Sequence, residues 1–164
     1  MRFIIEPAGG EARDVPLDTG VLSREMEESL PALGDYGEVA VALTFVTDGE
    51  MKGLNERYRG IGESTDVLSF PLWEEDGRFV PPASWSELPL GDVVVSPDFV
   101  RANAEKEDIG YNIEMARIVI HGVLHLVGFG HDTDRRGDEM WGLQEEILGR
   151  YLVRMEQRGG LMAE

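Results

Sequence analysis

All three histidines of this 164-residue chain lie within eleven consecutive residues. His121 and His125 are four residues apart, so on a helix their imidazole rings project from one face, one turn apart. At that separation two rings can bind one metal ion. Gly128 can end such a helix in a left-handed conformation and reverse the chain, which lets His131 approach as a third ligand. The spacing therefore predicts a metal site at His121, His125 and His131.

The types of donor atom narrow the chemistry of this site. Three imidazoles in a chain without cysteine favour one Zn²⁺ per chain, although imidazole also suits Ni, Cu and Fe. Three protein ligands leave one position of a tetrahedral ion open, as in catalytic rather than structural zinc sites. A lone histidine among apolar residues is more often an ordinary core residue, but three at this spacing indicate a metal centre.

The same histidine spacing occurs in metzincin proteases, in which a glutamate after the first histidine acts as the general base. This chain has Gly122 at that position, so peptide hydrolysis by that mechanism lacks its base. Met140 could be compared with the methionine under the metzincin metal. It falls in the apolar stripe of a helix, however, which favours ordinary packing.

An attack on phosphorus is a second chemistry open to such a metal. It would place negative charge on the phosphoryl oxygens, and a guanidinium is well suited to hold that charge. Arg57 and Arg59 are the candidates. The alternative, that they are surface arginines paired with Glu56 or Glu63, is equally compatible with their spacing.

Composition limits the possible functions further. The chain is 42% hydrophobic and 29% charged, which is typical of soluble globular proteins. It has no apolar run of about 18 residues to span a bilayer and no signal peptide, so we expect a cytoplasmic protein that does not contact membranes. The net charge of −17 argues against a protein that coats nucleic acid through bulk electrostatic attraction. Any polyanion would have to be bound by a local group of basic residues.

Hydrophobic periodicity predicts strands and helices in alternation. Strands are expected at 2–6, 39–46, 66–70 and 91–95. Helices are expected at 19–33, 47–60, 112–127, from 97 onward and from about 132 to 151. The helix at 112–127 is apolar on much of its circumference, so it should be central and buried with its histidines.

Three local features lead to further expectations. The acidic residues Glu25, Glu27 and Glu28 are expected on a solvated helix face. Tyr58 is expected on the inner face of its helix, and 72–90 is expected to be a loop region. The tryptophans at 73 and 85 could either pack on the core or form a wall facing a substrate.

Several blocks of the chain resemble, in order, the signature of the YbeY family, which are bacterial metal-dependent endoribonucleases implicated in ribosomal RNA maturation. They are LNERYR at 54–59 followed by TDVLSFP at 65–71, LGDVVVS at 90–96, HGVLHLVGFGH at 121–131 and QEEIL at 144–148. Together they cover most of the chain from Val39 to Leu152. The family usually has Tyr-Asp before its third histidine. This chain has Phe129 and Gly130 there, with Asp132 after the histidine, which leaves open whether Asp132 supports the ligands.

The resemblance implies a single α+β domain over residues 1–164, with a small mixed sheet of about four strands, about five helices and the metal-binding helix at the centre. It implies that His121, His125 and His131 hold Zn²⁺ and that Arg59, rather than Arg57, contacts RNA or the scissile phosphate. We therefore expect these three histidines and Arg59 to be the catalytic residues.

The function implied by the resemblance is zinc-dependent cleavage of single-stranded RNA, at the 3′ end of small-subunit ribosomal RNA and in ribosome quality control. RNA and the ribosome or its associated proteins would be the partners. The nucleophile is either water or a ribose 2′-hydroxyl. The alternative is a metal-stabilised ribosome-associated factor with little nuclease activity, which the acidic surface would suit.

Overall fold

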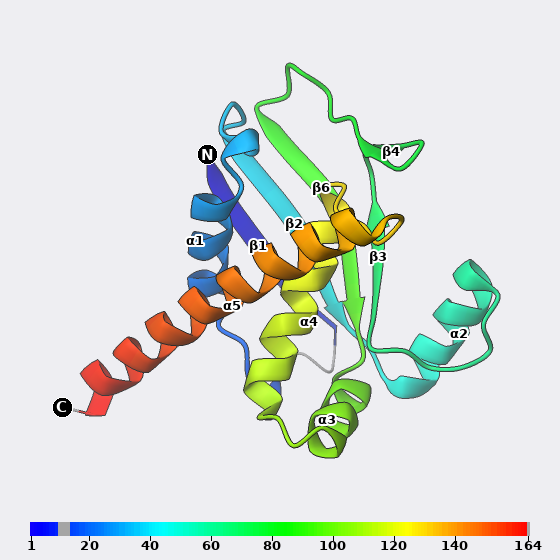
Figure 1. Cartoon of the computed structure of the whole chain (residues 1–164), viewed down its shortest axis with the longest axis vertical. Helices are drawn as coiled ribbons and strands as arrows, with labels where there is room; N and C mark the ends of the chain where they lie inside the picture. Colours follow the sequence, from blue (N-terminus) through cyan, green and yellow to red (C-terminus); the bar gives the residue numbers. More distant parts are fainter. Residues whose placement is uncertain (10–13, 164) are drawn as a thin grey trace.

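Three parallel strands and one antiparallel strand form the sheet that supports the histidines (Figure 1). In the computed structural model, which describes residues 1–9 and 14–163, the strand order is β1-β2-β6-β3, and only β3 runs antiparallel to its neighbour. The strands of this sheet are β1 (Arg2–Ala8), β2 (Glu38–Phe45), β3 (Val67–Pro71) and β6 (Glu87–Val95). The strands β4 (Glu74–Glu75) and β5 (Arg78–Phe79) form a separate two-stranded hairpin.

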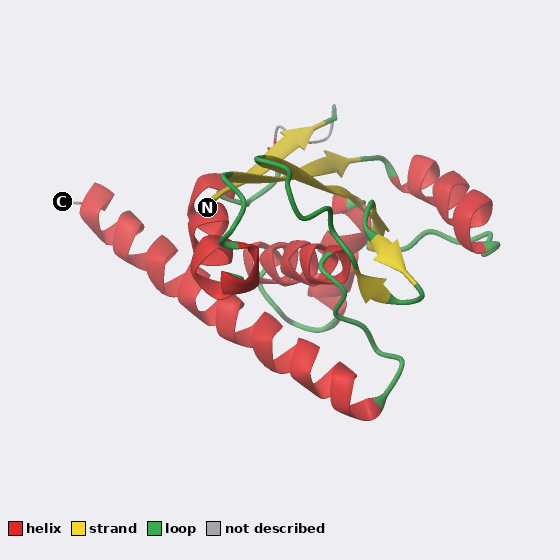
Figure 2. Cartoon of the chain, turned by 90° about the horizontal axis from the view of Figure 1, so that it is seen from above, coloured by secondary structure: helices red, strands yellow, loops and turns green. Residues whose placement is uncertain are grey.

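Helices cover one face of this sheet (Figure 2). The α-helices are α1 (Thr19–Ser29), α2 (Asp48–Arg59), α3 (Pro97–Lys106), α4 (Tyr111–Leu126) and α5 (Asp134–Ala163). α4 packs on β3 and β6, α1 packs on β1, and α5 lies against both helices. α2 stands apart at the end of the sheet, over a small second cluster of apolar side chains. None of the helices in the described ranges has an apolar stretch long enough to cross a bilayer.

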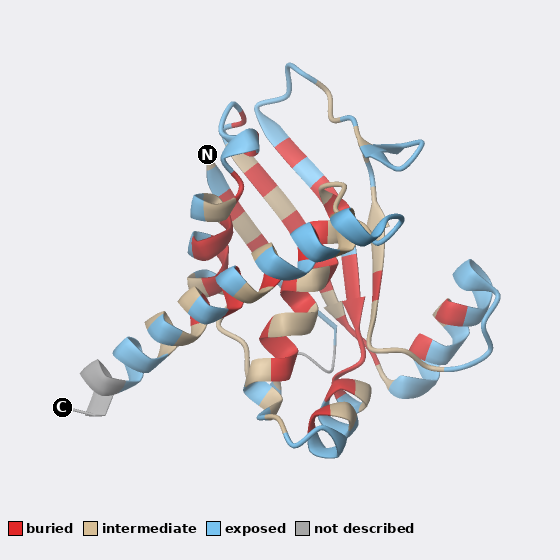
Figure 3. Cartoon of the chain, in the orientation of Figure 1, coloured by how far each residue is buried: buried red, intermediate tan, exposed pale blue. Residues whose placement is uncertain are grey.

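The expected α+β domain, with a four-stranded mixed sheet and a central α4, is confirmed (Figure 3). Val119, Ile120, Val123 and Leu124 are completely buried between the sheet and α5. Burial on all sides explains why this helix is apolar around most of its circumference. The strand β6 is longer than the expected 91–95, because it begins at Glu87.

The first half of β6 was not predicted from the sequence because it contains Pro89, and proline normally interrupts a central strand. In the structure Pro89 lies beyond the end of β3, and the register with β2 shifts just after its partner Ala40. Gly91 then has a φ of +132°, and a Cβ there would lie 2.2 Å from the carbonyl oxygen of Phe70. The irregular register and the glycine therefore allow proline within the strand.

The region 72–90, expected to be a loop, contains the hairpin β4–β5. Its turn consists of Asp76 and Gly77, which have φ values of 51° and 76°. Positive φ at both central residues is typical of a type I′ turn, for which Asp-Gly is a preferred sequence. The loop prediction was therefore wrong over these residues, and the Asp-Gly pair was the signal that it overlooked.

Two expectations about α1 were also wrong. The helix ends at Ser29 rather than continuing to 33, because Pro31 cannot donate the next helical hydrogen bond and starts the short 3₁₀ turn η2 (Pro31–Leu33). Glu25 is not solvated but has 0% exposure, and its carboxylate pairs with Arg150 and Arg154 of α5. Its burial is therefore set by the helix that packs across it.

The expected inner face of α2 is only partly correct. Met51 is fully buried, and Thr47 caps the helix by accepting a hydrogen bond from the amide of Glu50 at 3.1 Å. Tyr58 is instead 59% exposed and contacts the ring of Phe70 edge to face at 5.0 Å. The last turn of α2 therefore projects from the body of the protein.

Candidate metal centre

α4, which carries the first two histidines, lies unusually close to the sheet at Gly122. A Cβ atom on this residue would lie 2.7 Å from Cγ1 of Val93 and 3.2 Å from Cγ2 of Val67. The hydroxyl of Ser69 on β3 donates a hydrogen bond to the carbonyl of Gly122 at 2.9 Å. A glutamate would not fit here without displacing α4. The packing of α4 on the sheet therefore leaves no room for a metzincin base at this position.

The third histidine is brought in by the turn that follows α4. Gly128 has a φ of +95°, and the amide of Phe129 donates to the carbonyl of Leu124 at 3.1 Å. These interactions end the helix and turn the chain back, as the sequence predicted. His131 then lies beside the two histidines of α4.

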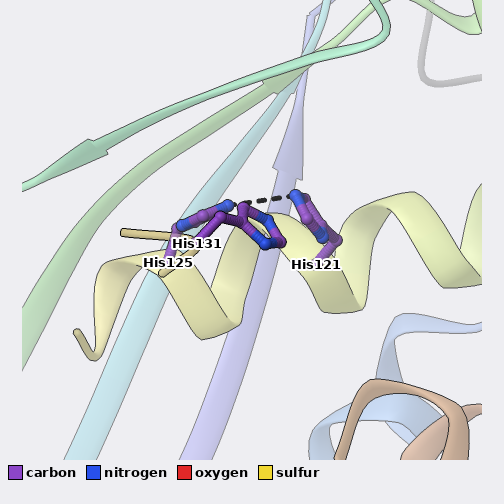
Figure 4. Close-up of side chains that lie close together, drawn as sticks. All are labelled: His121, His125 and His131. Carbon is purple, nitrogen blue, oxygen red and sulfur yellow. Dashed lines mark hydrogen bonds between the residues drawn. The ribbon is translucent and has the colours of Figure 1, made fainter. Parts of the chain in front are cut away.

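The three imidazole rings converge on one point (Figure 4). One nitrogen from each of His121, His125 and His131 lies within 4.8 Å of the other two. The ring centroids are 4.5 Å, 5.4 Å and 5.3 Å apart. Three imidazoles at such spacing can bind one metal ion, whereas side chains that serve packing alone have no reason to point their nitrogens at one place.

Hydrogen bonds on the far side of two rings fix which nitrogen faces the centre. Nδ1 of His125 lies 2.9 Å from the carbonyl oxygen of Phe129, and Nδ1 of His121 lies 2.8 Å from Oε1 of Gln144. Both acceptors require a proton on Nδ1, which leaves each neutral ring with a lone pair on Nε2. The two Nε2 atoms are only 3.0 Å apart. Nε2 lone pairs this close to one another can bind the same cation, so the residues fit a metal ion.

The protonation state of His125 also suits a ligand. Burial lowers its pKa to about 4, assisted by the neighbouring His121 and His131 and opposed by the hydrogen bond to Phe129. The ring is therefore neutral near pH 7. A metal ion would not have to displace a proton from it.

Gln144 is the part of the site that sequence reasoning missed. It is 2% exposed on α5, in line with the buried Met140, Ile147 and Tyr151. These four residues repeat at helical spacing, so a polar side chain within an apolar stripe was the available signal. Met140 packs in the core, as its place in that stripe predicted.

A cleft of about 630 Å³ opens beside the histidines and contains three arginines. Arg59 reaches it from the end of α2, Arg78 from the hairpin and Arg136 from α5. Arg57 is not among the lining residues. The structure thus brings Arg59 together with the three histidines and leaves Arg57 outside.

The hairpin forms one part of the cleft lining. A Cβ on Gly128 would lie 2.9 Å from Cβ of Phe79, so β5 packs directly on the turn that leads to the third histidine. Trp73 lines the cleft and also packs on the core, while Trp85 is 47% exposed and contacts Trp73 edge to face at 5.0 Å. Trp73 therefore combines the two roles that the sequence left open.

Asp132 follows the third histidine and stabilises the loop. Its carboxylate pairs with Nη1 of Arg136 at 2.8 Å, and the same guanidinium donates to the carbonyl of Gly128. Thr133 caps α5 by accepting from the amide of Arg136 at 3.1 Å. Asp132 thus supports the turn between the second and third histidines through Arg136.

Comparisons with known proteins give a consistent result. A family model described as Endoribonuclease YbeY matches residues 11–152. The chain is 42% identical over 133 residues to the Endoribonuclease YbeY of Pelotomaculum thermopropionicum, which covers 80% of this chain and 85% of that relative. It is 33% identical over 148 residues to the Endoribonuclease YbeY of Bacillus subtilis, with 84% and 94% covered.

A solved structure shows the same fold. The solution structure of a Thermotoga maritima protein superposes with a TM-score of 0.62 at 29% sequence identity. The superposition covers 94% of this chain and 93% of that protein.

Proposed function

This chain belongs to the YbeY family, and from that premise we propose that it is a zinc-dependent endoribonuclease that cuts single-stranded RNA. The main support for the proposal is that three imidazoles and Arg59 line the same cleft. A bound zinc ion would supply a Lewis acid that polarises a phosphoryl oxygen and acidifies water. His121, His125 and His131 would hold that ion through the nitrogens that face the centre.

We assign Arg59 to the phosphate that is cut. It is the last residue of α2, and Gly60 ends the helix in a left-handed conformation with φ +70°, so the guanidinium extends from a fixed helix end. It is exposed and forms no ion pair with another described residue. A guanidinium free of a carboxylate can offer two parallel donors to phosphate oxygens and stabilise the charge that develops there.

Arg78 provides a second cation in the cleft. It follows the Asp76-Gly77 turn, and its neighbour in the hairpin, Phe79, packs on Gly128. Like Arg59 it is exposed and unpaired within the described ranges. We assign Arg78 to the RNA backbone next to the scissile phosphate, because it lines the same cleft and a tight two-residue turn fixes the backbone that carries it.

The charge of the cleft differs from that of the whole protein. The cleft lining contains three carboxylates, those of Asp66, Glu74 and Asp132, and three arginines, so it is formally neutral while the chain carries −17. A divalent ion would make the cleft positive. RNA would therefore be attracted at this place and repelled elsewhere, and the attraction would depend on the metal.

We extend the proposal to maturation of the 3′ end of small-subunit ribosomal RNA and to ribosome quality control in the cytoplasm. The family resemblance supports this assignment. An acidic exterior also suits an enzyme that is guided to one RNA site by the ribosome or an associated protein, because free RNA would bind it weakly. A guiding partner would supply the contacts that the surface lacks.

Replacement of Arg59 tests the proposal. We expect Arg59→Ala to slow cleavage of a single-stranded RNA oligonucleotide by about 10²–10³-fold, the usual effect of removing one group that stabilises transition-state charge. Arg57→Ala is the matched control, because it removes the same charge two residues away but outside the cleft. Equal turnover by wild type and Arg59→Ala, with ribosome binding lost, would favour the ribosome-associated factor without nuclease function.

A further inference from the structure

A chain of hydrogen bonds runs from α4 through α5 and back to the first histidine. Resting on the metal site proposed above, we propose that Arg117, Glu145 and Gln144 are positioning residues that fix the tautomer of His121 and thereby set the affinity of the chain for zinc. None of the three lines the cleft. They act on the metal only through the ring that they orient.

The first link is the pair of Arg117 and Glu145. Nε and Nη2 of the guanidinium donate to the two oxygens of the carboxylate at 3.0 Å and 3.1 Å, while Nη1 donates to Glu114 at 2.8 Å. The parallel bonds fix the plane of the Glu145 carboxylate. Burial raises the pKa of Glu145, but the hydrogen bonds from Arg117 and Gln144 outweigh it and lower the pKa overall. The carboxylate is therefore ionised and can only accept hydrogen bonds.

The ionised carboxylate determines how the amide of Gln144 is turned. Nε2 of Gln144 lies 3.2 Å from Oε2 of Glu145, and Oε1 lies 2.8 Å from Nδ1 of His121. An acceptor-only carboxylate requires the NH₂ group on its own side, so the amide oxygen must face the histidine. That oxygen in turn requires a proton on Nδ1. The Nε2 lone pair of His121 therefore points to the metal position.

Within the described ranges, His121 is the one ligand whose ring is hydrogen-bonded by a side chain from outside the three histidines. His125 is held by a backbone carbonyl, that of Phe129, which no substitution can remove. No hydrogen bond to the ring of His131 occurs among the described residues, and this ring is exposed. Gln144 is consequently the position at which the chain can tune the site without changing a ligand.

The affinity for zinc tests the proposal directly. We expect Gln144→Met, which keeps the size of the side chain and removes the acceptor, to weaken binding of zinc by about 10–100-fold. Glu145→Gln and Glu146→Gln form a matched pair, since each removes one negative charge from adjacent positions of α5. Among the described residues Glu146 forms an ion pair with Arg150 and no hydrogen bond with Gln144. Glu145→Gln should weaken binding, and Glu146→Gln should not.

Competition with a chromophoric chelator at pH 7.5 measures these affinities, and thermal unfolding confirms that each variant is folded. The double variant Gln144→Met with Glu145→Gln should lose no more affinity than Gln144→Met alone, because the two residues act in series. Wild-type affinity in Gln144→Met, or equal losses in the two charge variants, would overturn the proposal.

The tautomer of His121 can be measured in the absence of metal, which gives a second test of the proposal. Long-range ¹H–¹⁵N NMR spectra of the zinc-free protein should show the proton of His121 on Nδ1 in wild type and a mixture of tautomers in Gln144→Met. An Nε2–H tautomer in the wild type would contradict the inference even if zinc binds. If the wild type binds no zinc, the proposed function fails, and this spectrum still decides whether the residues orient the ring.

Discussion

Gly122→Ala is a small change that probes how the metal-binding helix is positioned. In an ordinary helix interior, alanine is more stable than glycine by about 1 kcal/mol. Here the new methyl group would lie 2.7 Å from Cγ1 of Val93 and 3.2 Å from Cγ2 of Val67. Val93 is completely buried, so it has no room to move aside. Overpacking of this kind costs about 1–3 kcal/mol, which offsets or exceeds the gain in helix propensity.

Gly142→Ala is the matched control, because Gly142 is exposed in α5 and a Cβ there would have no neighbour within 4 Å. It should gain up to about 1 kcal/mol. The gain in helix propensity is common to both variants, so we expect their free energies of unfolding to differ by the overpacking cost alone, about 1–3 kcal/mol in favour of Gly142→Ala. Urea unfolding of zinc-free protein, followed by circular dichroism, measures this difference.

Displacement of α4 should also affect the ligands on either side of the contact. Gly122→Ala should bind zinc more weakly than Gly142→Ala, because His121 moves with the backbone that Ser69 now holds at 2.9 Å. The reasoning is refuted if Gly122→Ala is as stable as Gly142→Ala and binds zinc as well. That result would mean that the contact between α4 and the sheet relaxes at no cost.

Three further changes have distinct expected outcomes. Glu25→Ala should destabilise the protein by about 2 kcal/mol, because it leaves two half-exposed arginines without their buried partner. Glu28 is exposed, so Glu28→Ala should lower the free energy of unfolding by less than about 1 kcal/mol in the same urea experiment. The pKa of His125 is about 4 in the folded protein, against 6.5 for an ordinary histidine. As the pH falls, the unfolded chain therefore binds a proton at His125 before the folded chain does. The stability of the zinc-free protein should accordingly decrease from about pH 6.5 toward pH 4. His125→Asn should reduce this slope between pH 6.5 and 5; an unchanged slope would show that His125 is not buried in its neutral form. Gly77→Ala should slow RNA cleavage, because alanine is strained at a φ of +76° in the turn before Arg78. An unchanged cleavage rate would show that the hairpin does not contribute to cleavage.

The histidine site was predictable because its signals are local. The four-residue spacing of His121 and His125 follows from helical geometry, and the helix-ending role of Gly128 follows from its left-handed conformation. Both depend on fewer than a dozen consecutive residues. The grouping of the three imidazole rings could therefore be predicted from the sequence without knowing which elements pack around them.

Features that depend on distant elements were not predictable in the same way. Glu25 is buried because α5 crosses α1 and supplies Arg150 and Arg154 from more than 120 residues away. Tyr58 is exposed because α2 leaves the body of the protein before its last turn. Periodicity within one helix shows which face is apolar, but it does not show which element will cover a charged residue beside that face.

Two missed features did have local signals. Asp76-Gly77 is a preferred pair for a tight hairpin, although the surrounding prolines and acidic residues suggested a loop. Gln144 lies in the apolar stripe of α5, where a polar residue needs a partner. Its partner, His121, could be identified only once α4 and α5 were known to pack together.

The central claim is that three histidines hold a zinc ion that RNA cleavage requires. The most direct test measures zinc content by elemental analysis and cleavage of a single-stranded RNA by the same preparations of wild type and His125→Ala. We predict about one zinc ion per wild-type chain and loss of both zinc and cleavage in His125→Ala, because two imidazoles no longer complete the site. Cleavage at the wild-type rate by protein verified to be free of metal would contradict the claim.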